Sequence, residues 1–199
     1  MRFLRKQAHF TRRLAVLAGS FNPPTRAHLA LGAAALGKAD EVLFALPQSL
    51  PHKTYEGVDA AARGEMLVQA LVGHPRFSAA VTEGGLFIEI ARECRPEYPG
   101  VEEIAMLCGR DAAERIVSWE YGEDDSIERQ LAEYSLLVAA RQGVYWPPER
   151  LRGRIQAISM PEEFDWHSST AVRERIGAGE NWRELVPPSI HALVERYYS

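Results

Sequence analysis

Short apolar runs alternate along this chain with longer segments of helical periodicity. Strands that are buried on both faces of a sheet appear in a sequence as continuous apolar runs of about four to eight residues. The strand candidates of this kind are residues 14–18, 41–46, 77–82, 104–108, 136–140 and 154–158.

The predicted helices have apolar residues at helical spacing or a composition rich in alanine and leucine. They comprise residues 27–36, a segment that begins at Asp59, and residues 126–133, 170–176 and 189–198. Residues 86–95 leave two alternatives open, because Ile88 and Ile90 alternate as in a strand while the run IEIAREC also fits a helix.

Strands that alternate with helices predict βαβ units, and hence a single α/β domain with a Rossmann-like, doubly wound parallel sheet. Ligands bind such sheets beyond the carboxyl ends of the strands. The loops that follow residues 18, 46, 108 and 140 and the turn before Thr170 should therefore converge on one site.

Residues 1–13 carry five basic side chains and no acid. They lack the apolar stretch of a signal peptide. We interpret them as a basic leader exposed to solvent, outside a single domain at 14–199. The alternative is an arm that attracts phosphate.

Composition and charge narrow the class of protein. The chain is 46% hydrophobic and 25% charged, with a net charge of -4, so its overall charge gives no reason to expect a nucleic acid partner. No apolar run reaches the length of a membrane span. Cys94 and Cys108 form no C-x-x-C pair, which is typical of free thiols in a reducing compartment, so we expect a cytoplasmic protein.

The first motif is GSFNPPTRAH at 19–28. Gly19 allows the backbone to turn sharply after the strand and to approach a ligand closely. Thr25 is a typical N-cap residue whose hydroxyl could accept the N–H of His28. In the first helical turn, the His28 imidazole and the helix N-terminus would face the same anion and could stabilise charge on a reacting phosphate. The alternative is a capped helix with an incidental histidine.

Two further motifs follow later strands. Pro51-His52-Lys53 offers a mobile positive charge suited to a phosphate that moves during reaction, although an exposed turn lysine is the alternative. Gly109-Arg110-Asp111 ends the fourth apolar run, and Asp111 could accept hydrogen bonds from ribose hydroxyls. Trp119 lies eight residues beyond and is either a stacking residue or a core or lid aromatic.

The fourth motif is His167-Ser168-Ser169-Thr170-Ala171-Val172-Arg173. Its consecutive hydroxyls at a helix start add side-chain donors to the unpaired backbone N–H groups. Arg173 supplies a planar fork suited to phosphate groups. The alternative for any one hydroxyl is simple helix capping.

Taken together in this order, the four motifs resemble the nicotinate/nicotinamide mononucleotide adenylyltransferases of the [H/T]-x-x-H nucleotidyltransferase superfamily, over roughly residues 14–173. The resemblance implies an enzyme of NAD biosynthesis that transfers AMP from ATP to the pyridine mononucleotide and releases pyrophosphate. It implies that Mg²⁺ arrives with ATP and has few direct protein ligands. Assembly into a homo-oligomer is left open.

The resemblance also implies the roles of individual residues. The implied catalytic residues are His28, Lys53 and Arg173. The implied ATP-binding residues are Gly19, Ser20, Phe21, Thr25, His28, Gly109, Asp111, Ser168, Ser169, Thr170 and Arg173. The implied mononucleotide-binding residues are Asn22, Lys53, Gly84, Gly85 and Trp119.

The chain departs from the family pattern at several positions. Thr25 stands where many members have His, Ala27 where many have Gly, and His167 where an apolar residue is usual. Gly84-Gly85 and the two residues after it replace an S-Y-T segment that helps to hold the pyridine carboxylate in bacterial members. We expect the backbone N–H groups of this glycine turn to supply the missing donors. Nicotinate mononucleotide should then be preferred over nicotinamide mononucleotide, but by a smaller margin than in members with S-Y-T.

Two alternatives to this function stay open at this point. One is an adenylyltransferase for another phosphate acceptor such as phosphopantetheine. The other is a non-catalytic nucleotide-binding protein of the same fold, because a fold does not establish a function.

Overall fold

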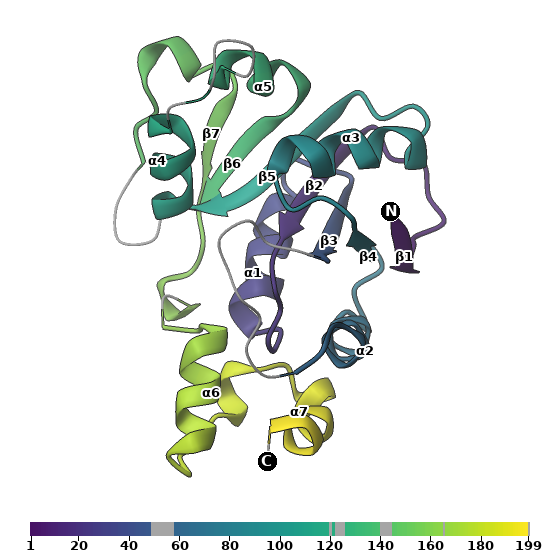
Figure 1. Cartoon of the computed structure of the whole chain (residues 1–199), viewed down its shortest axis with the longest axis vertical. Helices are drawn as coiled ribbons and strands as arrows, with labels where there is room; N and C mark the ends of the chain where they lie inside the picture. The colour runs from purple at the N-terminus through teal and green to yellow at the C-terminus, as the bar shows by residue number, and fades with distance from the viewer. Residues whose placement is uncertain (49–57, 120, 122–125, 140–144, 165, 199) are drawn as a thin grey trace.

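The computed structural model describes residues 1–48, 58–119, 121, 126–139, 145–164 and 166–198. A seven-stranded sheet crosses the molecule (Figure 1). In spatial order its strands are β1 (Arg2–Arg5), β4 (Phe77–Thr82), β3 (Glu41–Pro47), β2 (Arg13–Ala18), β5 (Glu103–Gly109), β6 (Ser135–Ala139) and β7 (Ile155–Ile158).

The strands β2 to β7 are all parallel to one another. Their order runs outward from β2 through β3 and β4 on one side and through β5, β6 and β7 on the other. This is the strand order of a Rossmann sheet, in which the direction of winding reverses between the two central strands. The expected doubly wound α/β sheet is confirmed.

The helices connect the strands or follow the sheet. They are α1 (Arg26–Ala35), α2 (Ala60–Ala70), α3 (Phe87–Glu97), α4 (Arg110–Ser118), α5 (Ile127–Glu133), α6 (Ser169–Gly177) and α7 (His191–Tyr198). Short 3₁₀ turns span Glu149–Leu151, Glu162–Phe164, Arg183–Leu185 and Pro188–Ile190.

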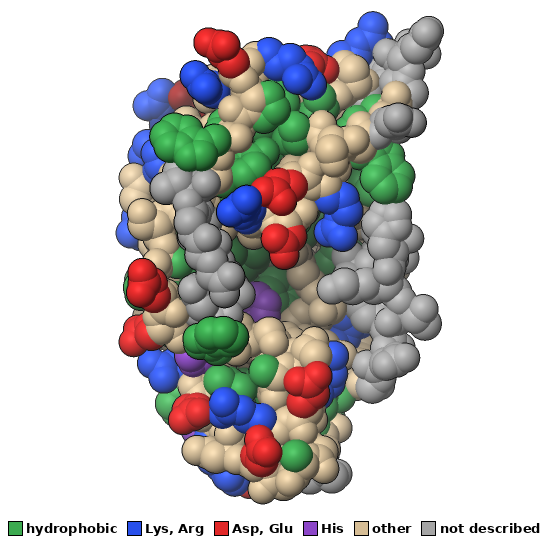
Figure 2. All heavy atoms as spheres, turned by 90° about the vertical axis from the view of Figure 1, so that its left-hand side faces the viewer, with side chains coloured by type: hydrophobic (Ala, Val, Ile, Leu, Met, Phe, Trp, Pro, Cys, Tyr) green, Lys and Arg blue, Asp and Glu red, His purple; other side chains and the backbone are tan. Residues whose placement is uncertain are grey.

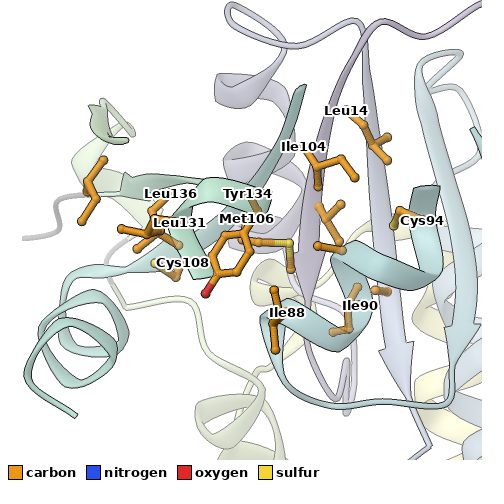
Figure 3. Packing of buried hydrophobic residues seen from close by; sticks show 14 of the residues in the cluster. Leu14, Ile88, Ile90, Cys94, Ile104, Met106, Cys108, Leu131, Tyr134 and Leu136 are labelled. Atoms are coloured by element: carbon orange, nitrogen blue, oxygen red, sulfur yellow. The ribbon is translucent and has the colours of Figure 1, made fainter. Parts of the chain in front are cut away.

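Alternate residues of each strand contribute to two different cores. Leu14 and Val16 of β2 join the cluster on the α3, α4 and α5 side, while Ala15 and Leu17 join the cluster on the α1 side. Figure 3 shows the first cluster, with Ile88 and others from α3 lying over the sheet residues. Burial on both faces explains why these strands appear in the sequence as continuous apolar runs.

The ambiguous segment 86–95 lies mostly in the helix α3. Ile90, Ala91 and Cys94 are all buried on the side of α3 that meets the sheet. Spacings of one and three residues place these side chains on one helical face, so the helical alternative is correct. Helix α4 was not predicted.

A third cluster forms at one end of the molecule, where α6 and α7 lie close to α2 (Figure 1). Met66 of α2 packs there with Val172 of α6 and Val194 of α7. The C-terminal helices are thus packed against α2. Within the described residues, no helix is long and apolar enough to cross a membrane.

The N-terminal residues do not form the expected solvent-exposed leader. Residues 2–5 form the edge strand β1, antiparallel to β4, with Arg2 opposite Val81 and Phe3 opposite Ala80. The Arg5 guanidinium donates to the carbonyls of Leu71 and His74 at the end of α2, at 2.5 and 3.0 Å. Backbone pairing and a cation on helix-terminal carbonyls explain why a basic segment joins the sheet.

Candidate active site

The first and third motifs leave the sheet from its two central strands. In the β2–β5 register, Leu17 lies opposite Leu107, so the ends of these strands at Ala18 and Gly109 are close together. Gly19 begins the first motif, and its N–H donates to the carbonyl of Ala45 on β3 at 3.0 Å. The two motifs therefore flank the crevice at which doubly wound sheets bind their ligands.

Thr25 and His28 interact at the start of α1. Thr25 is the N-cap residue, as predicted, and it is fully buried. Its backbone N–H donates to Nδ1 of His28 at 2.9 Å, and its hydroxyl lies 2.8 Å from the same atom. Thr25 and His28 form a reciprocal capping box, as the sequence predicted, and the His28 N–H also lies 3.1 Å from the Thr25 carbonyl.

The hydrogen bond from Thr25 determines the tautomer of His28. Because Nδ1 accepts a backbone N–H, the neutral imidazole carries its proton on Nε2. Phe21 supports the ring from the side, with an edge-on contact at 5.2 Å between the ring centroids. The imidazole is therefore held in one orientation with Nε2–H as its donor.

The backbone between Gly19 and Thr25 is held by side chains from other helices. Phe21 has a positive φ of 45°, which is uncommon for a residue with a side chain. Arg63 of α2 is buried and donates to the Ser20 carbonyl at 3.0 Å. Arg173 of α6 donates to the Asn22 carbonyl at 2.6 Å. These bonds stabilise the unusual conformation of the loop between them.

The fourth motif docks directly onto the first. Ser168 caps α6 by accepting the N–H of Ala171 at 3.0 Å. The Ser169 hydroxyl donates to the Pro23 carbonyl at 2.8 Å, and Thr170 is exposed beside it. The structure therefore brings together the first and fourth motifs, although Ser168 and Ser169 have capping and docking roles in addition to any contact with ATP.

Arg173 makes contacts that the sequence did not predict. One nitrogen holds the Asn22 carbonyl, and the other lies 3.5 Å from the Thr170 hydroxyl. A guanidinium has five N–H donors, so these contacts leave capacity for a phosphate. Arg173 lies one turn into α6 and is half-buried.

His167 lies just before this helix. Its ring meets Phe164 edge-on at a centroid distance of 5.3 Å. Burial, and then the nearby Arg26, lowers the pKa of His167. Its Nδ1 is buried and has no hydrogen-bond partner among the described residues, and the structure assigns it no role.

The third motif has the expected placement. Gly109 is the N-cap of α4, and Asp111 is exposed in the first turn of that helix. Trp119 follows the last turn and is 53% exposed, which excludes the alternative of a core aromatic. Helix α4 therefore carries Asp111 and Trp119 at its two ends.

The glycine turn contradicts one prediction. Glu89 accepts the N–H groups of Gly85 and Leu86, each at 3.0 Å, and Glu93 accepts the N–H of Gly84 at 2.8 Å. The expectation that this turn donates its N–H groups to a substrate carboxylate is wrong in this structure. The reason is that two acids of α3 satisfy those donors, as side chains commonly do at helix starts.

Lys53 and its neighbours Pro51 and His52 lie outside the described residues, so their assignment stays a prediction. Tyr198 was not among the predicted site residues, and its hydroxyl donates to Oδ1 of Asn22. Arg63 was given no site role either, although it lies in the helix after the second motif at the spacing that the family shows, and the structure buries it against the first motif. Figure 2 shows a hollow on one face of the molecule, with a histidine at its floor and acidic and basic side chains around it.

The site combines a helix start of the kind that can bind an anion, an oriented imidazole and an arginine fork, beyond the carboxyl ends of the parallel strands. Such groups can position two phosphate-bearing ligands and stabilise charge without a protein nucleophile. In the part of the chain that the structure describes, no three His, Cys, Asp or Glu side chains form a metal-ligating group. A cation held by ATP phosphates and water needs no such group, so Mg²⁺ remains compatible with these residues.

Comparison with known proteins agrees with this geometry. The model of the "Cytidylyltransferase-like" family matches residues 16–175. A protein of Thermus thermophilus named "Probable nicotinate-nucleotide adenylyltransferase" is 31% identical over 193 residues, covering 93% of this chain and 97% of the relative. A protein of the same name from Methylibium petroleiphilum is 29% identical, covering 94% of this chain and 89% of the relative.

Solved structures share the fold. The Plasmodium falciparum nicotinic acid mononucleotide adenylyltransferase complexed with NaAD superimposes with a TM-score of 0.70 at 16% identity, covering 94% of this chain and 96% of that one. The same enzyme complexed with APC gives a TM-score of 0.68. At this identity the structural likeness establishes the fold, and the sequence relatives establish the family. The chain belongs to the cytidylyltransferase-like nucleotidyltransferases and, among them, to the nicotinate-nucleotide adenylyltransferase family.

Proposed function

We propose that this protein transfers AMP from ATP to nicotinate mononucleotide and releases pyrophosphate, a step of NAD biosynthesis. The observation that carries the proposal is the junction of the first and fourth motifs. Ser169 contacts Pro23, and Arg173 contacts Asn22, so the two candidate phosphate-binding helix starts adjoin one loop. The family of the chain supports the reaction, and this junction supports its location between the two motifs.

The chemistry requires positioning and charge stabilisation. An oxygen of the mononucleotide phosphate forms a bond to the α-phosphorus of ATP. The bond from that phosphorus to the oxygen bridging to the β-phosphate breaks, and the electron pair leaves with pyrophosphate. We assign Nε2–H of His28 to an oxygen of the transferring phosphoryl group, since the other ring nitrogen is occupied by Thr25. Arg173, with Lys53 from the segment outside the described residues, is assigned to phosphates.

The remaining assignments follow the family resemblance. Gly109 and Asp111 would bind the nucleotide at the start of α4, and Trp119 would stack on the pyridine ring. Mg²⁺ bound through ATP oxygens would offset part of the phosphate charge. The reaction is expected in the cytoplasm, as the thiols also indicated.

A panel of four phosphate-bearing acceptors tests the proposed reaction. Pyrophosphate release from ATP is measured with nicotinate mononucleotide, nicotinamide mononucleotide, phosphopantetheine or flavin mononucleotide. We expect turnover with the pyridine mononucleotides and background release with the others. Turnover with phosphopantetheine alone would move the protein to another acceptor of the superfamily. ATP binding without turnover of any acceptor would support the non-catalytic alternative.

A further inference from the structure

The C-terminal helix reaches the first motif through Tyr198. Its hydroxyl donates to Oδ1 of Asn22, a residue 176 positions earlier in the chain. Asn22 is only 6% exposed, so its side chain lies in a confined space. Burial raises the pKa of Tyr198, although Arg173 and Arg63 nearby act in the opposite direction. The phenol therefore remains protonated at neutral pH and serves as a donor.

Asn22 is held from two helices at once. Arg173 of α6 binds its backbone carbonyl at 2.6 Å, and Tyr198 of α7 binds its side-chain oxygen. When the oxygen of an amide side chain accepts a bond on one side, its NH₂ group is directed to the other side. The phenol thus determines how the Asn22 amide is presented within the loop that leads to His28.

We infer that Tyr198 is a positioning residue for the mononucleotide, acting through the amide of Asn22. The inference rests on the proposed function, in which Asn22 belongs to the mononucleotide side of the site. Tyr198 is assigned no direct contact with a reacting group. Its effect should therefore appear in the affinity for the mononucleotide, with ATP binding at the α6 start largely unchanged.

The packing of α7 does not depend on the hydroxyl of Tyr198. Val194 of α7 is fully buried in the cluster with Met66 and Val172, and the rings of the two terminal tyrosines pack against it. Removing only the phenolic oxygen in Tyr198→Phe keeps this packing. A change in kinetics without a matching loss of stability would therefore reflect the hydrogen bond to Asn22.

Tyr197 provides a matched control on the same helix. Its hydroxyl donates to Oε2 of Glu65 on α2, away from the first motif. Tyr197→Phe removes one tyrosine hydroxyl bonded to a side-chain oxygen, as Tyr198→Phe does. The two variants differ only in the acceptor of the lost hydrogen bond, which is Asn22 for Tyr198 and Glu65 for Tyr197.

The experiment compares wild type, Tyr198→Phe, Tyr197→Phe, Asn22→Ala and the double variant Tyr198→Phe/Asn22→Ala. KM and kcat are measured for the mononucleotide and for ATP, with melting temperatures alongside. We expect Tyr198→Phe to raise the mononucleotide KM about 5- to 10-fold with little change in the KM for ATP. Tyr197→Phe should match wild type. The double variant should be no worse than Asn22→Ala, because both changes remove the same interaction.

Other outcomes would overturn the inference. A Tyr198→Phe enzyme within twofold of wild type would do so while leaving the proposed function intact. So would equal increases in both KM values together with a lower melting temperature, which would indicate a structural role. Strictly additive effects in the double variant would show that Tyr198 acts independently of Asn22. If wild type itself turns over no pyridine mononucleotide, the proposed function fails and the inference fails with it.

Discussion

The backbone N–H of Thr25 donates to Nδ1 of His28 at 2.9 Å. A side chain in the first helical turn thus caps the residue that caps the helix, a role usually filled by Glu or Gln. The interaction leaves Nε2 as the donor of the neutral ring. This bond links Thr25 and His28 and explains why the first motif has a capping residue and a histidine three positions apart.

Loss of the imidazole should affect the chemical step. His28→Ala should lower kcat by roughly 10²–10³, the size observed when one preorganised transition-state donor is removed. ATP affinity should change much less, because the α1 start and Arg173 remain. Steady-state kinetics together with ATP calorimetry check this. Turnover within a few-fold of wild type would exclude His28 as the catalytic group.

Two amide substitutions at His28 separate the role of Nε2 from that of Nδ1. A Gln side chain can place an amide N–H near the position of Nε2, whereas an Asn side chain reaches only as far as Nδ1. His28→Gln should therefore retain more kcat than His28→Asn, at similar melting temperatures. The reverse order would indicate that the Thr25 contact, and not a donor at Nε2, is what the reaction requires.

Arg173→Lys should weaken ATP binding while the mononucleotide site remains. Lysine keeps the charge but cannot hold both the Asn22 carbonyl and a phosphate with one planar fork. Calorimetry with ATP measures the effect. Arg175→Lys is the control, since Arg175 lies on the same helix but pairs with Glu184. Unchanged ATP affinity in Arg173→Lys would refute the assignment.

Trp119→Ala should raise the KM for either pyridine mononucleotide by about tenfold or more and leave ATP binding unaffected. The expected size is that of losing one base–aromatic stack. Trp146→Ala serves as the control because that indole is 77% exposed and has no predicted contact with ligand. Equal effects of the two substitutions would argue against stacking at Trp119.

The choice of pyridine base should depend on Glu89. Its carboxylate occupies the N–H groups of Gly85 and Leu86, so those donors cannot bind a substrate carboxylate. We predict that nicotinate mononucleotide is the better acceptor, but by a smaller margin than in a member with S-Y-T. Removing the charge in Glu89→Gln should increase the preference for nicotinate over nicotinamide mononucleotide, because repulsion of the substrate carboxylate decreases.

The quantity to compare for base choice is kcat/KM for the two mononucleotides at matched ATP and Mg²⁺. A tenfold or greater preference for the nicotinamide form in wild type would overturn the assigned base. A margin that narrows in Glu89→Gln would show that this carboxylate supports nicotinate binding.

A stability prediction concerns the opposite end of the sheet. Glu41 is 1% exposed at the start of β3 and accepts hydrogen bonds from the hydroxyls of Thr11, Ser78 and Tyr98. Glu41→Gln replaces one acceptor oxygen by an NH₂ group and leaves at least one hydroxyl without its partner. The free energy of unfolding should fall by about 1–3 kcal/mol.

Thermal unfolding checks this, with a Tm lower by roughly 2–4 °C for each kcal/mol lost. The kcat at room temperature should not change, because β3 begins far from the carboxyl edge. Glu102→Gln, which removes an exposed partner of Arg12, should leave Tm nearly unchanged. Equal melting temperatures for the two variants would contradict the prediction.

The sequence by itself determined the features that depend on local pattern. Leu14 to Leu17 supply apolar groups to both faces of the sheet, so β2 could be predicted from four adjacent residues. Gly19, Thr25 and His28 have roles set by strand end and helix start, which is why the first motif predicted a phosphate site. The order of the motifs along the chain was enough to identify the family.

Only the tertiary structure decided which distant groups satisfy one another. Phe3 lies in an edge strand because β4 offers an unpaired edge, which no local pattern near Phe3 reveals. The N–H of Gly85 is occupied because α3 places Glu89 next to it. Tyr198 and Asn22 meet because α7 packs against α2 and α6. A hydrogen bond depends on position in space, and residues far apart in sequence acquire their relative positions only when the core is packed.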